Sequence, residues 1–270
     1  MVDFSSLFGR GISSAPFVFT EFDPDAQAYI NAVESADGQA LEAEVARAIV
    51  RFVKGCKTDG IWTAIKACCI LAGAKTLAGA LVPLVGAAPT NINFISSNYN
   101  RKTGLVGNGT SRYLNSNRAN NADPQDNKHL AVYAFTTSSS ATAWIGSLVR
   151  SPSLSVSQIF HNTGSQITGG INTGTQSDAA YFAPTGFIGF SRGNATEQSA
   201  RINNITTEFA SSSNSNHTLN TLVFARNDAG TVNSRSNGRI SFYSIGESLN
   251  LALLDARVSA LMTDFNSYIP

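Results

Sequence analysis

The sequence predicts a mainly β protein with added helices, in which a two-sheet antiparallel jelly roll lies between an N-terminal helical region and a closing helix. The composition of the 270-residue chain changes near residue 88. Residues 1–87 hold most of the helix-forming sequence, whereas short apolar runs with turn signals between them recur after residue 88. Many short strands of this kind are typical of a sandwich or jelly roll.

These changes predict four parts of the chain. Residues 1–23 form an extended arm, residues 24–87 a helical connector or oligomerisation region, residues 88–248 the jelly roll and residues 249–270 a C-terminal helix. The arm is apolar without a helical period, and exposed aromatics at this density are costly. The arm can pack on its own domain or insert into a neighbour; we favour a neighbour, to which it would anchor the protein through the following residues: Phe4, Leu7, Phe8, Phe17, Phe19 and Phe22.

Three helices are expected before the jelly roll. The first begins at Asp23-Pro24, an N-cap followed by a proline suited to the first turn, and ends at Ala36-Asp37-Gly38. A second, amphipathic helix spans Gln39–Lys54 and is ended by Gly55. A third spans Gly60–Leu71. The closing helix runs over Leu249–Tyr268.

The strands follow Pro89. Asn108-Gly109 predicts a hairpin that joins 104–106 to 112–114, and Asn237-Gly238 predicts a second turn. A continuous apolar run at 130–135 is typical of a core strand. The other expected strands are Ala143–Val149, Val156–His161, Tyr181–Phe182, Gly186–Ser191, Ala200–Ile205, Leu219–Ala225 and Arg239–Ile245.

Charge and cysteine content exclude several classes of protein. The charged fraction is 14% and the formal net charge is +1, so a general electrostatic grip on nucleic acid or on an anionic membrane is not expected. The apolar stretch Ile61–Val85 is interrupted by Lys66, Lys75 and Pro83 and is expected to be core, without membrane insertion. The cysteines Cys56, Cys68 and Cys69 cannot form a disulfide framework and indicate folding in a reducing cytosol.

No catalytic set stands out in the sequence. Gly189–Gly193 matches the G-x-S-x-G pattern, but strand-like sequence follows it instead of the helix that a nucleophile elbow needs. The acids of the second half are dispersed and lack the Glu-x-Asp-x-x-Glu spacing of jelly-roll glucanases, so we predict no catalytic residues. No cofactor is expected.

One loop has residues that could bind a metal ion. Asp123, Asp126 and His129 lie in or beside the loop Asn120–Lys128, whose oxygen ligands could hold calcium weakly. The loop lacks the charge density and the closing glutamate of a strong calcium loop. The prediction is no metal site, with a weak calcium site as the alternative.

Three segments carry a family resemblance: GIWTAIKACCILAGAKT, then NYNRKTGLVGNGTSRYL, and finally GRISFYSIGESLNLALLDARVSALMTDF at residues 238–265. Over roughly residues 24–268 the chain resembles virion proteins of marine phages and cyanophages that carry a concanavalin-A-like or laminin-G-like jelly roll. The resemblance implies a two-sheet jelly roll that is often a glycan or surface binder, and it brings no catalytic residues.

Together these observations predict a non-enzymatic phage virion protein, a tail fibre or surface fibre component assembled in the bacterial cytoplasm. Its partners would be other virion proteins, a homotrimer of itself and host-surface glycan. The aromatic and arginine side chains expected to contact glycan are Trp144, Tyr113, Tyr181, Arg112 and Arg118. The alternatives are a capsid decoration or head-fibre protein, and a glycan-degrading enzyme.

Overall fold

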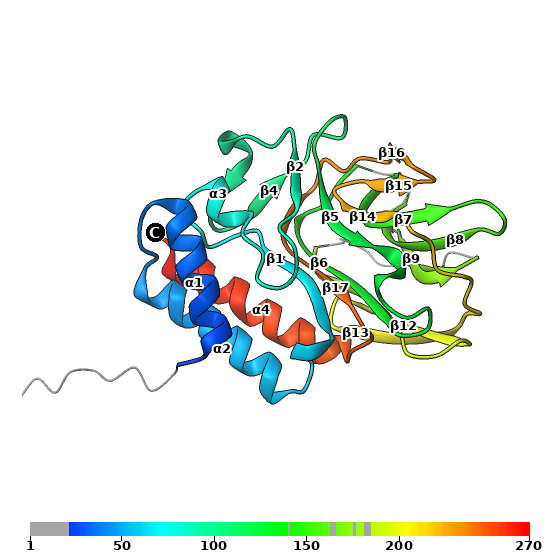
Figure 1. Ribbon diagram of the computed structural model, residues 1–270, viewed down its shortest axis with the longest axis horizontal. Helices are drawn as coiled ribbons and strands as arrows, with labels where there is room; N and C mark the ends of the chain where they lie inside the picture. Colours follow the sequence, from blue (N-terminus) through cyan, green and yellow to red (C-terminus); the bar gives the residue numbers. More distant parts are fainter. Residues whose placement is uncertain (1–21, 140, 163–165, 175–176, 181–184) are drawn as a thin grey trace, which may run out of the picture.

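The computed structural model describes residues 22–139, 141–162, 166–174, 177–180 and 185–270. Within these ranges the chain forms two β-sheets that face each other, and a layer of helices covers the outer side of one of them (Figure 1). No helix among the described residues is both long and apolar enough to cross a membrane.

Sheet A lies next to the helices. Its order is β13-β12-β11-β6-β17-β4-β3, and β1 pairs with β17 beside β4. The strands of sheet A are β1 (Ile65–Ile70), β3 (Tyr99–Asn100), β4 (Gly104–Val106), β6 (Lys128–Thr136), β11 (Gly186–Arg192), β12 (Glu197–Ile202), β13 (Ile205–Ala210) and β17 (Arg239–Gly246).

Sheet B forms the other side of the sandwich. Its order is β10-β9-β8-β7-β14-β5-β2, and the short strands β15 and β16 attach beside β7. The strands of sheet B are β2 (Thr90–Ile92), β5 (Tyr113–Ala119), β7 (Thr142–Val149), β8 (Ser155–His161), β9 (Gln166–Thr173), β10 (Ser177–Ala180), β14 (Asn220–Val223), β15 (Arg226–Asp228) and β16 (Thr231–Asn233).

The two sheets enclose the first of two apolar cores. Phe190 of sheet A and Ile159 of sheet B are both fully buried in it. The paired strands are antiparallel apart from β15, which runs parallel to β7. The two-sheet arrangement and the closing helix confirm the predicted jelly-roll-like fold class.

The helices are α1 (Pro24–Asp37), α2 (Ala43–Thr58), the short α3 (Leu77–Ala80) and α4 (Leu251–Tyr268). The predicted limits of α1 are confirmed, because the Asp23 side chain accepts hydrogen bonds from two backbone N–H groups and Gly38 ends the helix in the left-handed conformation. The closing helix is confirmed as α4. The helix α2 starts and ends four residues later than the sequence predicts.

The second core lies between the helices and the outer face of sheet A. The helix α4 packs against α2, beside which it lies in Figure 1, and also contacts β11 of sheet A. Phe52 of α2 meets Phe242 of β17 with ring centroids 5.8 Å apart. Gly55 does not end α2. A β-carbon at Gly55 would stand 2.7 Å from Arg257 of α4, so the glycine makes room for that side chain.

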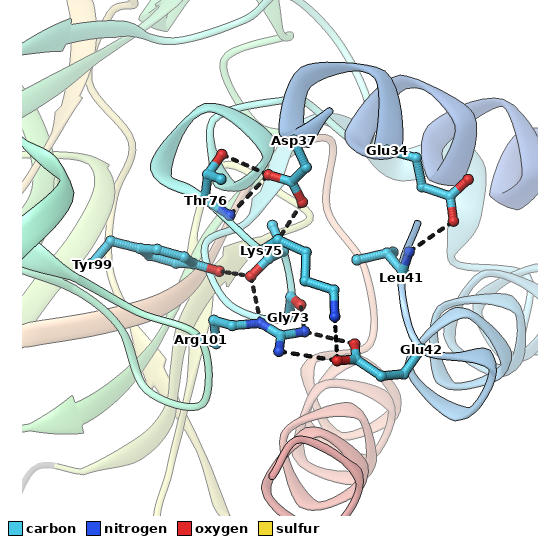
Figure 2. A network of polar contacts seen from close by, with 10 residues as sticks. Glu34, Asp37, Leu41, Glu42, Gly73, Lys75, Thr76, Tyr99 and Arg101 are labelled. Carbon is cyan, nitrogen blue, oxygen red and sulfur yellow. Dashed lines mark hydrogen bonds and ion pairs between the residues drawn. The ribbon is translucent and has the colours of Figure 1, made fainter. Parts of the chain in front are cut away.

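A polar network joins the helices to the sandwich (Figure 2). Asp37, at the end of α1, accepts hydrogen bonds from the backbone N–H groups of Lys75 and Thr76 at 2.6 and 2.8 Å and from the Thr76 hydroxyl at 2.6 Å. Glu42 accepts from Arg101 at 2.7 and 3.1 Å and also pairs with Lys75. We call these five residues the Asp37–Glu42 network. It ties both ends of the α1–α2 connection to loops of the sandwich.

Three predicted elements are corrected by the structure. The predicted helix Gly60–Leu71 is instead a short 3-10 turn followed by β1, because Ile65–Ile70 pairs with β17. The predicted hairpin at Asn108-Gly109 is wrong, since β4 lies in sheet A and β5 in sheet B. The predicted strand Ala200–Ile205 spans the turn between β12 and β13. The predicted strand Tyr181–Phe182 lies outside the described residues.

Candidate functional site: a groove with two carboxylates

An open polar groove of about 280 Å³ lies on the outer face of sheet A, where α4 begins. We call it the carboxylate groove, after the two exposed glutamates in its lining. It is lined by Ser191, Gly193, Asn194, Glu197, Gln198, Ser199, Glu208, Ser248 and Leu249. Its volume is close to the lower end for small-molecule sites, roughly 300–1,000 Å³.

Strand register places the two carboxylates together. In the β12–β13 hairpin Ser199 pairs with Glu208 and Glu197 pairs with Ala210, so the two glutamates are diagonal neighbours on the same face. Such neighbours lie roughly 7–8 Å apart. Glycosidases use two carboxyl groups that flank one bond, and this hairpin brings two glutamates to one face of the sheet.

The groove lies on the part of the outer face of sheet A that is next to the start of α4. Leu251, at the start of α4, packs closely over Gly189 of β11. Farther along the helix, Asp255 binds Arg201 of β12 at 2.8 Å. The first residues before α4, Ser248 and Leu249, form one wall of the groove. The helix therefore covers part of the outer face and leaves the ends of β12 and β13 exposed.

Polar groups in the groove can exchange hydrogen bonds with hydroxyl groups. The Asn194 side chain organises the β11–β12 turn, because its Oδ1 accepts from the backbone N–H groups of Thr196 and Glu197 at 2.9 and 2.8 Å. Its Nδ2 donates a long hydrogen bond of 3.5 Å to Glu197. The amide is thus held at the groove with one carboxylate beside it.

The G-x-S-x-G match does not form a nucleophile elbow. Ser191 lies within β11, is 4% exposed, and accepts a hydrogen bond from the Leu249 backbone at 3.3 Å. A turn and β12 follow it instead of a helix. A nucleophilic role for Ser191 is therefore not supported.

The side chains predicted to contact glycan lie elsewhere. Trp144 is fully buried, stacks on His161 and donates from Nε1 to Ser138 at 3.0 Å, so its predicted role at the surface is wrong. Arg118 is tied to the buried Asp123 by two hydrogen bonds and does not line the groove, so its predicted contact with glycan stays a prediction.

The remaining predicted contact residues do not line the groove. Arg112 and Tyr113 are half-buried at the start of β5 in sheet B, and the Arg235 guanidinium lies 5.9 Å from the Tyr113 ring centre. Tyr181 lies outside the described residues. In the predicted arm, Phe22 is described and is 70% exposed, whereas Phe4, Leu7, Phe8, Phe17 and Phe19 lie outside the described residues.

The predicted calcium loop surrounds the amino group of Lys128. Lys128 is 4% exposed, and its Nζ donates to Asn216 Oδ1 at 2.6 Å, to Asn120 Oδ1 at 3.1 Å and to the Asn120 carbonyl. Among the described residues, no group of three or more His, Cys, Asp or Glu side chains is arranged to hold a metal ion. Two oxygens of this loop, the carbonyl and the Oδ1 of Asn120, are thus hydrogen-bonded to Lys128.

No family model matches the chain, and no curated protein matches it. A mutant sialidase of Trypanosoma rangeli with trans-sialidase activity is similar at 9% identity with a TM-score of 0.48, over 80% of this chain and 39% of that one. The K499G mutant of the NanB sialidase of Streptococcus pneumoniae is similar at 14% identity with a TM-score of 0.42, over 58% of this chain and 27% of that one.

A third similar structure is domain 4 of AbnA, a GH43 extracellular arabinanase of Geobacillus stearothermophilus, in complex with arabinotriose. The identity is 16% and the TM-score 0.39, over 64% of this chain and 82% of that domain. The chain thus spans well under half the length of the sialidases, but most of this single domain.

These findings correct the predicted function. A non-enzymatic structural protein of a phage particle was expected, whereas the similar solved structures are sialidases and a domain of an arabinanase. The predicted tail-fibre role and the predicted lack of enzymatic activity are withdrawn on this finding. The predicted phage origin, virion location, homotrimer and division into four parts are not addressed by these findings and stay predictions.

Proposed function

We propose that the chain is a glycan-active β-sandwich protein that binds a carbohydrate chain along the carboxylate groove. The observation that carries the proposal is the placement of Glu197 and Glu208, both exposed, on one face of two paired strands beside an open groove. Carboxylates accept hydrogen bonds from sugar hydroxyls, and hydrogen bonds to charged groups are stronger than neutral ones.

The rest of the lining suits the same ligand. Asn194, Ser199 and Ser248 offer amide and hydroxyl groups that both donate and accept. Leu249 adds an apolar surface for the C–H face of a sugar ring. The groove is open, so a polymer can enter along it without a conformational change.

Binding is tested with arabinan, xylan, mixed-linkage β-glucan and chitin oligosaccharides by isothermal titration calorimetry. We expect one class to bind and the double substitution Asn194→Ala with Ser199→Ala to weaken it about tenfold or more, because two hydrogen bonds of roughly 1 kcal/mol are lost. Glu44→Gln, on the far helix α2, is the matched control and should bind as the unmodified protein does. Absence of binding to any neutral glycan, or binding indifferent to the groove variants, would refute the proposal.

A second candidate function is hydrolysis of the bound glycan. It is favoured by the diagonal pairing of Glu197 and Glu208, which gives the two carboxylates that glycosidases use. The assay is release of reducing ends from the glycan that binds. Loss of release in Glu197→Gln and in Glu208→Gln, with binding retained, would establish the enzyme. If the unmodified protein binds and releases no reducing ends, hydrolysis is excluded and binding stands.

A further inference from the structure

A buried amine touches a side-chain amide that is distant in sequence. Lys128 is the first residue of β6, and Asn216 lies in the segment between β13 and β14. Their side chains meet with Lys128 Nζ 2.6 Å from Asn216 Oδ1, across a separation of 88 residues. Because Lys128 is 4% exposed, solvent does not compete for this contact.

The surroundings favour the nucleophilic form of the amine. Burial lowers the pKa of Lys128 to about 7, against the attraction of Asp123 and Asp126, which raises it. A lysine with such a pKa is partly neutral near pH 7, and a neutral amine carries the lone pair that attacks a carbonyl carbon.

The amide of Asn216 is polarised from two sides. Its Oδ1 accepts from Lys128 and also from Asn172 Nδ2, at 2.7 Å. Its Nδ2 donates to the Asp123 backbone carbonyl at 3.1 Å. Donors fixed on a carbonyl oxygen stabilise the negative charge that develops there when a nucleophile adds, as in an oxyanion hole.

One carboxyl oxygen in the same loop is left without a hydrogen-bond partner in the described part of the chain. Asp126 Oδ1 is buried and has no hydrogen-bond partner among the described residues, and its charge acts on Lys128. Asp123 differs, because both of its carboxylate oxygens are bound by Arg118. Lys128 also borders a small cavity of about 10 Å³, about the volume that one water molecule needs.

From this geometry we propose that Lys128 and Asn216 react to form an intramolecular amide bond. The lone pair of Lys128 Nζ adds to Cγ of Asn216, the Cγ–Nδ2 bond breaks, and ammonia leaves. Asp126 takes a proton from Nζ and returns it to the departing nitrogen. Asn172 stabilises the intermediate oxyanion. Amine and primary amide become secondary amide and ammonia, so no oxidant or reductant is needed.

The bond would join the two sheets at one end of the sandwich. Lys128 belongs to sheet A, while the segment of Asn216 leads into β14 of sheet B. A covalent link over this separation restricts the unfolded chain, as a disulfide does, in a protein whose three cysteines are free. The proposal does not depend on glycan binding.

The first test is the mass of the intact, denatured protein, followed by peptide mapping. We expect a mass lower by one ammonia than the sequence requires, and a branched peptide that contains Lys128 and Asn216. Lys128→Met and Asn216→Ala should each restore the full mass. Asp126→Asn should leave both reacting groups in place and slow or abolish the loss. Asn214→Ala, in the same segment, is the control that should keep the link.

Asn-Gly sequences such as Asn108-Gly109 and Asn237-Gly238 can also lose ammonia by closing on their own backbone. That reaction yields no branched peptide and would persist in Lys128→Met, so the map separates the two. A full, unmodified mass in the folded protein, or ammonia loss without the branched peptide, would overturn the proposal whatever the variants do.

Discussion

Two acidic regions of the molecule use their carboxylates in opposite ways. In the Asp37–Glu42 network the acids are held by Lys75, Thr76 and Arg101, and Asp37 is 9% exposed. In the carboxylate groove, Glu197 and Glu208 are exposed at the edge of sheet A, and the one hydrogen bond described for their carboxylates is the 3.5 Å contact from Asn194. Carboxylates whose bonding capacity is already used stabilise the fold, whereas open ones are available to a ligand.

The largest expected effect on stability comes from the Asp37–Glu42 network. Asp37→Ala removes the acceptor for the backbone N–H groups of Lys75 and Thr76, so two donors lose their partner. We expect the free energy of unfolding to fall by about 2–5 kcal/mol, since each unsatisfied buried donor costs roughly 1–3 kcal/mol. Urea denaturation at neutral pH measures it.

A second variant checks the same contact from the other side. A β-carbon at Gly79 would stand 2.3 Å from Asp37 Oδ1, so Gly79→Ala should also destabilise the protein although it favours helix formation. Asn31→Ala, on the exposed face of α1, is the control and should stay within about 0.5 kcal/mol. A stable Asp37→Ala protein would contradict a structural role for the network.

Low pH should destabilise the fold through two buried histidines. Burial lowers the pKa of His129 and of His217 to about 4, from 6.5. The unfolded chain therefore binds their protons first, and stability is lost as the pH falls from 6.5 toward 4. The expected loss is up to about 3 kcal/mol for each histidine. A stability curve that stays flat over this interval would contradict their burial in the neutral form.

Glu42→Gln should have a smaller effect, with its own pH signature. The hydrogen bonds from Arg101 are the main cause that lowers the pKa of Glu42 to about 2, from 4.5. The carboxylate thus contributes its stabilisation fully above pH 4.5 and loses it as the pH falls toward 2. The variant should lose about 1–3 kcal/mol at neutral pH and lack this acidic part of the curve. An unchanged acid limb in Glu42→Gln would show that other groups govern it.

The sequence predicts the elements that local signals determine. The caps of α1 and the apolar face of α4 are local, and both helices are where they were expected. Ile65–Ile70 contains no breaker and reads as helix, but its pairing with β17, far away in the chain, makes it a strand. Turn residues likewise did not reveal that β4 and β5 belong to different sheets.

The groove escaped sequence analysis for a related reason. Asn203 and Asn204 both have positive φ, of 51° and 62°, which suits a tight two-residue hairpin turn. Asn-Asn is a weaker turn signal than Asn-Gly, and the sequence prediction places it inside one strand, Ala200–Ile205. With the turn missed, nothing paired Ser199 with Glu208, and Glu197 and Glu208 remained two acids among several. The sequence analysis instead predicts a glycan contact for Trp144, whose side chain is buried.

The smallest expected effect on stability comes from the carboxylate groove. It tests most directly whether the carboxylates of the two regions have different roles. Glu197→Gln and Glu208→Gln remove exposed charges from neighbouring strands, so each should change the free energy of unfolding by no more than about 0.5 kcal/mol. The double variant should be no less stable than either single one, because removing both charges also removes their mutual repulsion. Thermal unfolding of the three variants beside Glu42→Gln measures this. A loss in the groove variants as large as that of Glu42→Gln would make Glu197 and Glu208 structural residues and remove the distinction between the two regions.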